Sequence, residues 1–172
     1  MQLILVNCPG TTDEFRPSSC TQYDGFSNLF LAGTDGDSYA AQMHSNQSAA
    51  NINARSETAA QKVMFADGMR QRRCLVPADS YYEWQKNGQR KQKYEISPSG
   101  SEGFLLAGIY RMEQGRPVFS ILTKDPVESI AFIHNRMPVI LPKDAMTDWL
   151  NPKYNGIEIL SSAVSDMRFL AC

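Results

Sequence analysis

The sequence predicts an α+β protein of mainly antiparallel β structure, barrel-like and with a few short helices, in one domain over residues 1–172. Short apolar or aromatic stretches such as Tyr81-Tyr82-Glu83-Trp84-Gln85 alternate with turn residues, and aromatic residues favour strands. Asn87-Gly88 and the segment around Gly115 are typical of tight hairpins. No apolar run approaches the roughly 20 residues that span a bilayer, so we expect a cytoplasmic protein without membrane contact.

The first third of the chain predicts two strands and one helix. The strands are expected where the chain is apolar, over 1–6 and 26–32, with a long loop between them. Apolar residues follow at roughly helical spacing: Ala60, Val63, Met64 and Phe65. We therefore expect a helix over 54–72, with Asn53 or Ser56 as its cap and a break at Gly68.

Strands dominate the rest of the chain. They are expected over 74–77, 81–85, 91–96, 104–111 and 118–123. Pro126 suits the first position of a short helix, and another helix is expected over 142–150. The apolar run 157–160 predicts a closing strand.

Charge is unevenly distributed, although the net charge is only −1. Residues 55–93 contain nine basic and four acidic side chains, a local net of +5. This favours a basic surface, with a solvated charged face as the ordinary alternative. The four cysteines and two histidines lack the spacing of a zinc site or a disulfide framework. We expect no metal, no cofactor and no disulfide.

Two polar clusters precede or interrupt predicted strands. Asn53, Arg55 and Glu57 combine an amide, a guanidinium and a carboxylate, which can bind a phosphate or a sugar. A helix cap with an intrahelical ion pair explains them equally well. Glu83 lies in an aromatic strand and shares one side with Tyr81. Burial there would raise its pKa toward that of a general acid, whereas exposure on a one-sided sheet is the alternative.

A third cluster surrounds His134. This histidine lies between apolar stretches, and its imidazole is suited to proton transfer near neutral pH. Arg136 would share its side of an extended chain. A structural histidine is the alternative.

Taken in order, several segments resemble the SOS response-associated peptidase (SRAP) family. The matching segments are Asn53 to Thr58, Arg73 to Ala78, Tyr82-Glu83-Trp84 and His134 to Pro138, with weaker similarity at Val6 to Thr11 and Ser161 to Arg168. The resemblance implies a DNA damage response protein that binds single-stranded DNA containing abasic sites. Family members form a thiazolidine crosslink with the abasic aldehyde through an N-terminal cysteine, and some release a propeptide.

The resemblance also implies roles for individual residues. Asn53 would hold the terminal amine, Glu83 would act as acid and base, and His134 would assist proton transfer. Pro9, Arg55 and Arg136 would contact the DNA, the two arginines by clamping phosphates. We expect a monomer, associated with the nucleoid if the source is bacterial.

The chain departs from the family pattern near its start. Gln2 stands where the family has its nucleophilic cysteine, and Cys8 is not equivalent to that residue. Tyr39 is the single aromatic residue where the family has a stacking surface. We expect an N-terminally shortened or degenerate member, so enzyme activity of peptidase or lyase type is implied by the family alone. The alternatives are a non-catalytic DNA- or protein-binding module and a Glu/His hydrolase or β-elimination lyase.

Overall fold

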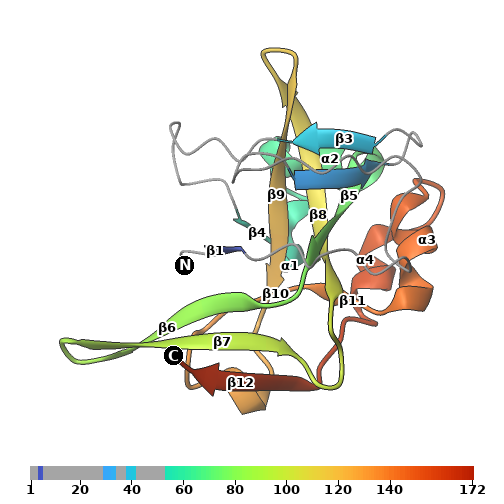
Figure 1. Ribbon diagram of the computed structural model, residues 1–172. Helices are drawn as coiled ribbons and strands as arrows, with labels where there is room; N and C mark the ends of the chain where they lie inside the picture. Colours follow the sequence, from blue (N-terminus) through green and yellow to red (C-terminus); the bar gives the residue numbers. More distant parts are fainter. Residues whose placement is uncertain (1–3, 6–28, 34–37, 42–52) are drawn as a thin grey trace.

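The computed structural model describes residues 4–5, 29–33, 38–41 and 53–172, and its strands form two sheets (Figure 1). The strands are β1 (Ile4–Leu5), β2 (Leu29–Gly33), β3 (Ser38–Ala41), β4 (Asn53–Arg55), β5 (Arg73–Ala78), β6 (Tyr81–Asn87), β7 (Arg90–Pro98), β8 (Phe104–Glu113), β9 (Arg116–Lys124), β10 (Met137–Pro138), β11 (Ile140–Leu141) and β12 (Met167–Ala171). The helices are α1 (Ser56–Ala59), α2 (Val63–Gln71), η3 (Glu128–Ile130), η4 (Lys143–Ala145), α3 (Met146–Leu150) and α4 (Gly156–Leu160).

The smaller sheet has the strand order β1-β6-β7-β12, and the larger sheet has the order β10-β9-β8-β5-β2-β3. In the larger sheet, β11 also pairs with β8, and β4 pairs with β9. The β4–β9 pair is parallel and places Asn53 opposite Ile121, whereas the other described pairs are antiparallel. The predicted class, mainly antiparallel β structure with a few short helices, is confirmed.

Alternating side chains of the larger sheet fill two separate cores. Val76, Leu106 and Ile121 contribute to a core shared with the smaller sheet and η3. Their chain neighbours point to the opposite face, because successive strand residues alternate, and there they pack against α1, α2 and α3. Trp149 of α3 is fully buried in this second core, and its Nε1 donates a hydrogen bond to the Cys74 carbonyl at 3.0 Å.

The predicted helix over 54–72 is wrong in its start and its break. Asn53 lies in β4, the caps are Arg55 and Lys62, and neither makes a side-chain cap hydrogen bond. Two helices replace the one expected, and α2 continues through Gly68. A Cβ at Gly68 would lie 3.1 Å from the Ile109 Cβ, so this glycine permits close helix–sheet packing.

The C-terminal prediction is also wrong. Residues 157–160 belong to α4, because the Asn155 side chain caps this helix by accepting a hydrogen bond from the Ile157 N–H at 3.0 Å. A four-residue apolar run does not distinguish strand from helix. The closing strand is instead β12, which pairs with β7 from Met167 to Ala171.

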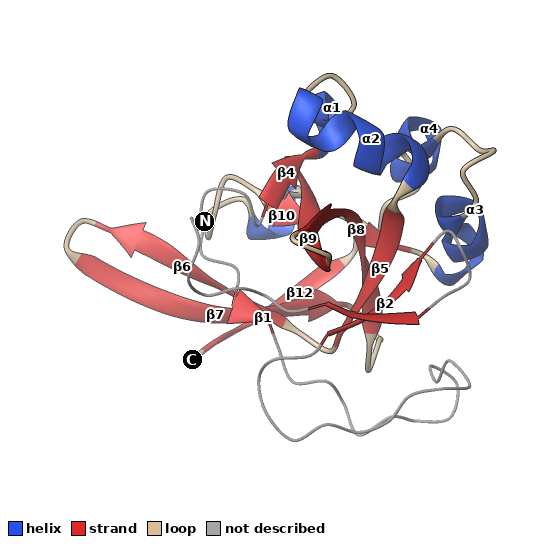
Figure 2. Cartoon of the chain, turned by 90° about the horizontal axis from the view of Figure 1, so that it is seen from above, coloured by secondary structure: helices blue, strands red, loops and turns tan. Residues whose placement is uncertain are grey.

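The β6–β7 hairpin differs by one residue from its prediction. Asn87 pairs with Arg90, so the loop consists of Gly88 and Gln89, with Gly88 at φ +60°. Figure 2 shows this hairpin projecting away from the rest of the molecule. Within the part of the chain that the structure describes, no helix is long and apolar enough to cross a membrane.

Candidate active site

Glu83 is a buried carboxyl group in the middle of β6. Its side chain is 2% exposed, and its Oε1 has no hydrogen-bond partner among the described residues. Burial raises the pKa of Glu83 to about 7, although the backbone N–H of Trp84 opposes the rise. The predicted rise in pKa is therefore confirmed, and the carboxyl group is suited to both donating and accepting a proton near neutral pH.

Tyr81 shares the buried face of β6 with Glu83, as the alternation predicted. Its hydroxyl is buried without a hydrogen-bond partner among the described residues. Burial and the nearby charge of Glu83 both raise the pKa of this phenol, which therefore stays protonated. A protonated phenol is a hydrogen-bond donor. Tyr81 thus supplies a hydrogen-bond donor. The sequence predicted that it shares one side of the strand with Glu83 but assigned it no role.

The loop that carries His134 packs over the same face of the smaller sheet. Tyr94 of β7 is directly opposite Glu83 in the β6–β7 register, and its ring lies 5.7 Å from that of Phe132. Ile133 is buried in the core that also contains Tyr81. Glu83 and His134 therefore lie on one side of the sheet, despite their separation in sequence.

The His134 ring is held by the backbone two residues later. Its Nδ1 accepts a hydrogen bond from the Arg136 N–H at 3.0 Å and lies 3.3 Å from the Arg136 carbonyl oxygen. The shorter contact favours the neutral tautomer with its proton on Nε2. Burial lowers the pKa of His134, and the charge of Lys86 lowers it further, whereas the Arg136 carbonyl opposes this effect. The neutral ring thus has Nε2–H as its donor, with no hydrogen-bond partner among the described residues.

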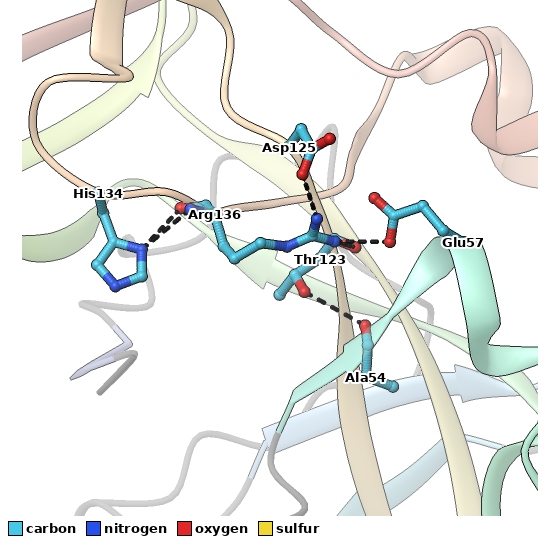
Figure 3. Close-up of polar contacts among 6 residues, drawn as sticks. All are labelled: Ala54, Glu57, Thr123, Asp125, His134 and Arg136. Carbon is cyan, nitrogen blue, oxygen red and sulfur yellow. Dashed lines mark hydrogen bonds and ion pairs between the residues drawn. The ribbon is translucent and has the colours of Figure 1, made fainter.

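Arg136 joins three segments of the chain (Figure 3). Its guanidinium donates to Glu57 at 2.7 Å, to Asp125 at 2.5 Å and to the Thr123 carbonyl oxygen at 2.6 Å. The Arg136 side chain is 12% exposed, and in Figure 3 its guanidinium extends away from the His134 ring. The shared side expected for these two residues is therefore not observed, because the two acids bind the guanidinium elsewhere.

Glu57 lies at the start of α1, where an intrahelical ion pair was the alternative to a phosphate- or sugar-binding cluster. Burial alone would raise the pKa of Glu57, but the hydrogen bond from Arg136 and the charges of Arg136 and Arg55 hold it below its ordinary value. The sequence did not reveal the ion pair with Arg136 or the participation of Asp125. Such a pairing depends on tertiary contacts, and no local spacing signals it.

Asn53 and Arg55 occupy β4, beside the residues that Arg136 holds. The Asn53 Oδ1 is shielded from solvent and has no hydrogen-bond partner among the described residues. Arg55 is exposed at the end of the strand. The Thr123 hydroxyl donates to the Ala54 carbonyl oxygen at 3.4 Å, which links β4 to β9 beyond the ladder.

Most of the predicted site residues lie in two places, which the backbone from His134 to Arg136 connects. Asn53, Arg55 and Arg136 belong to the β4–β9 end, and Glu83 and His134 belong to the face between β6 and the η3 loop. Pro9 lies outside the described residues. Within the described ranges, no group of three or more His, Cys, Asp or Glu side chains could hold a metal ion.

The fold and site define a two-sheet, mainly antiparallel protein with a buried carboxyl group whose pKa is raised. A family model described as SOS response associated peptidase (SRAP) matches residues 37–169. The chain therefore belongs to the SRAP family, as the sequence motifs predicted.

Curated relatives carry names that refer to abasic sites. The abasic site processing protein YoaM of Bacillus subtilis is 40% identical over 117 residues, which cover 64% of this chain and 52% of the relative. The abasic site processing protein YedK of Escherichia coli is 32% identical over 118 residues, covering 66% and 53%. The abasic site processing protein HMCES of Gallus gallus is 34% identical over 125 residues, covering 58% and 37%. The chain spans about half the length of the bacterial relatives.

Solved structures share the fold. A phage-related protein from Bordetella bronchiseptica aligns with a TM-score of 0.68 and 25% identity, covering 85% of this chain and 78% of that one. A protein from Bacteroides thetaiotaomicron aligns with a TM-score of 0.64 and 31% identity, covering 70% and 58%.

Proposed function

We propose that this chain processes abasic sites in single-stranded DNA, with Glu83 as its acid–base group. The observation that carries the proposal is the Glu83 carboxyl group, which is buried, lacks a hydrogen-bond partner for Oε1 among the described residues and has a pKa of about 7. Such a group is present in both protonation states at neutral pH. The names of the relatives, which refer to abasic site processing, support the same substrate.

The proposed chemistry begins with the aldehyde of the ring-opened abasic sugar. A primary amine attacks the aldehyde carbon, and one proton passes from its nitrogen to the carbonyl oxygen to give a carbinolamine. Protonated Glu83 then gives its proton to the hydroxyl, which leaves as water, and the Glu83 carboxylate takes up the remaining proton of the nitrogen to give an imine. In the family, the thiol of the N-terminal cysteine adds to the imine carbon and closes a thiazolidine ring. The proposal includes a second family activity, in which the same site releases a propeptide.

The other site residues have supporting roles in this proposal. Asn53 holds the amine through its acceptor oxygen, and His134 transfers protons through Nε2. Arg55 contacts a DNA phosphate from its exposed position. Arg136 contacts a phosphate only if that phosphate replaces Asp125 or Glu57 as its partner, since both acids hold the guanidinium. The proposal also takes the chain to be a monomer that binds DNA in the cytoplasm.

Trapping of the imine tests the proposal. The full chain is incubated with a single-stranded oligonucleotide containing one abasic site and is reduced with borohydride. An oligonucleotide with a tetrahydrofuran analogue, which has no aldehyde, is the blank. Trapping should fall at least about 100-fold in Glu83→Gln, given the usual contribution of general acid–base catalysis. The exposed Glu102→Gln variant should trap normally.

Two results would overturn the proposal. One is equal trapping by the Glu83→Gln and Glu102→Gln variants, because Glu83 would then have no role in proton transfer. The other is equal affinity of the chain for abasic and intact single strands together with no trapped product. The second result would favour a binding module for another partner.

Heat stability of the adduct tests the nucleophile separately. An imine whose nitrogen has no neighbouring thiol should hydrolyse on heating, and position 2 of the polypeptide tested is Gln2 and not a cysteine. Adding a Met-Cys-Gly-Arg segment before the chain should give a heat-stable adduct. A heat-stable adduct from the unmodified chain that persists in Cys8→Ala would contradict this account.

A further inference from the structure

The fold removes several basic side chains of residues 55–93 from the surface that DNA could contact. Arg73 is 1% exposed, and its guanidinium donates to the carbonyl oxygens of Tyr154 and Asn151. Arg70 and Arg72 both pair with Asp67 of α2. Because Arg73 is buried and Arg70 and Arg72 share one carboxylate, these three arginines present less positive charge to solvent than their number suggests.

Four of the nine basic residues of 55–93 lie on the β6–β7 hairpin. Lys86, Arg90 and Lys91 are exposed and form no ion pair with any described residue. Lys93 lies on the same ribbon, with its Nζ 4.0 Å from the centre of the Tyr82 ring. Between Glu83 and Glu95 the hairpin contains no acidic residue. The projecting ribbon in Figure 2 is therefore strongly basic.

Two of these lysines face each other across the hairpin. Lys86 is the direct partner of Lys91 in the antiparallel register. Like charges directly opposite each other destabilise a strand pair, and no described acid compensates these two. By the alternation of strand residues this pair lies on the face of Trp84, opposite the face of Glu83, whereas Arg90 pairs with Asn87 on the Glu83 face.

A polar hollow of about 630 Å³ is lined by two of the hairpin cations, Arg90 and Lys91. Its lining contains Gln85, Asn87, Arg90, Lys91, Gln92 and Tyr94. Amide side chains and cations of this kind bind phosphate oxygens. Tyr94 is paired with Glu83, and Gln85 follows Glu83 on the same side of the strand, so the hollow continues the buried face of Glu83 toward the hairpin tip.

We infer that the β6–β7 hairpin is a second phosphate-binding surface, which holds the single strand on one side of the site. The inference rests on the proposed function, because it takes the reacting nucleotide to lie at Glu83. From Glu83 to Asn87 the strand extends about 13 Å, so the hairpin reaches phosphates beyond the reacting nucleotide. Contacts to phosphate give affinity without sequence preference.

Charge removal with a matched control tests the inference. Arg90→Gln/Lys91→Gln removes the two cations that line the hollow, and Arg70→Gln/Lys153→Gln removes two exposed charges from α2 and from the loop before α4. Affinity for an unmodified single-stranded oligonucleotide is measured by fluorescence anisotropy from low to moderate salt. The hairpin variant should bind about ten-fold more weakly at low salt, with a log–log salt slope smaller by about 1.4. The control should change affinity less than two-fold.

Strand polarity gives a second readout. Oligonucleotides with a tetrahydrofuran analogue are extended on the 5′ side or on the 3′ side only. Because the hairpin lies on one side of Glu83, the Arg90→Gln/Lys91→Gln variant should lose affinity for one of the two extensions and keep it for the other. Equal losses, or equal effects of the hairpin and control variants while the parent chain binds DNA, would overturn the hairpin inference and leave the proposed function intact. Failure of the parent chain to bind DNA at low salt would overturn both.

Discussion

The guanidinium of Arg136 donates a hydrogen bond to the Glu57 carboxylate at 2.7 Å, although 79 residues separate the two in sequence. This contact ties the start of α1 to the loop that carries His134. Since the same guanidinium also binds the end of β9, its loss would release the relative positions of three segments. The ion pair therefore fixes the relative positions of these segments, with or without a contact between Arg136 and DNA.

Replacing the two acids that bind Arg136 should have unequal effects. Glu57→Gln should lower the free energy of unfolding by about 1 kcal/mol, because a charge-assisted hydrogen bond is weakened. Asp125→Asn should cost less than about 0.5 kcal/mol, because that side chain is 86% exposed. Urea denaturation at pH 7 measures both. Equal costs would show that the two acids are equivalent.

The pH dependence of the Glu57 contribution has a definite sign. The folded-state pKa of Glu57 is held below its ordinary value, so the contribution is present above about pH 4.5 and is lost as the pH falls further. Glu57→Gln should therefore differ from the parent chain most at neutral pH and least at pH 3. A difference that grows on acidification would contradict the pairing.

Glu83 should lower stability as the pH rises. Its folded-state pKa is about 7, above that of the unfolded chain, so the folded protein holds a proton that the unfolded chain has lost. The free energy of unfolding should fall between about pH 4.5 and pH 7 and then level off. Glu83→Gln should remove this fall and be more stable than the parent chain at pH 8, by about 1–3 kcal/mol. Glu102→Gln, at an exposed position, should leave the profile unchanged.

His134 should titrate below the ordinary histidine range. Burial lowers its pKa, so its contribution to stability is full above about pH 6.5 and is lost as the pH falls below that value. Long-range nitrogen–proton NMR spectra should show the Nε2-protonated tautomer at pH 7.5. The His44→Gln variant assigns the signals, because the sequence contains only two histidines. A midpoint above 6.5 for His134 would contradict its partly buried position.

Local pattern predicted the strands because each carries its signal within a few residues. Period-two alternation placed Tyr81 and Glu83 on one side of β6, and both are buried there. The same rule does not distinguish a four-residue strand from a helical turn, and α4 forms because Asn155 caps it. β12 carries exposed Phe169 and Leu170, so it lacked the alternation that marks a half-buried strand.

The partners of the site residues could not be predicted in the same way. Arg136 was expected near His134 because two residues separate them, yet its guanidinium is held by acids from two other segments. The burial of Arg73 was equally hidden, because its partners are backbone carbonyl oxygens of a loop about 80 residues later. Charge counted along the sequence therefore overstated the basic surface of α2 and β5 and gave no special weight to the hairpin.

Asn53 lies at one end of a row of residues that are paired across four neighbouring strands. In the register of the larger sheet, Cys74 of β5 is opposite Gly108 of β8, Gly108 is opposite Ile121 of β9, and Ile121 is opposite Asn53 of β4. A Cβ at Gly108 would lie 2.8 Å from the Cys74 Sγ, closer than real Cβ atoms approach. Adding a methyl group here should therefore displace strands along the row.

Gly108→Ala should lower the free energy of unfolding by about 2 kcal/mol, because the added methyl group overpacks the core. Cys74→Ala alone should cost about 1 kcal/mol by leaving a small cavity. The double variant should cost less than the sum, because the new methyl group occupies the space that the sulfur leaves. Gly103→Ala is the control, since its Cβ would lie 3.7 Å from the nearest atom. The side-chain amide resonance of Asn53 should shift in Gly108→Ala and return toward its parent position in the double variant. Strictly additive costs, with no shift at Asn53, would show that the row does not transmit the displacement.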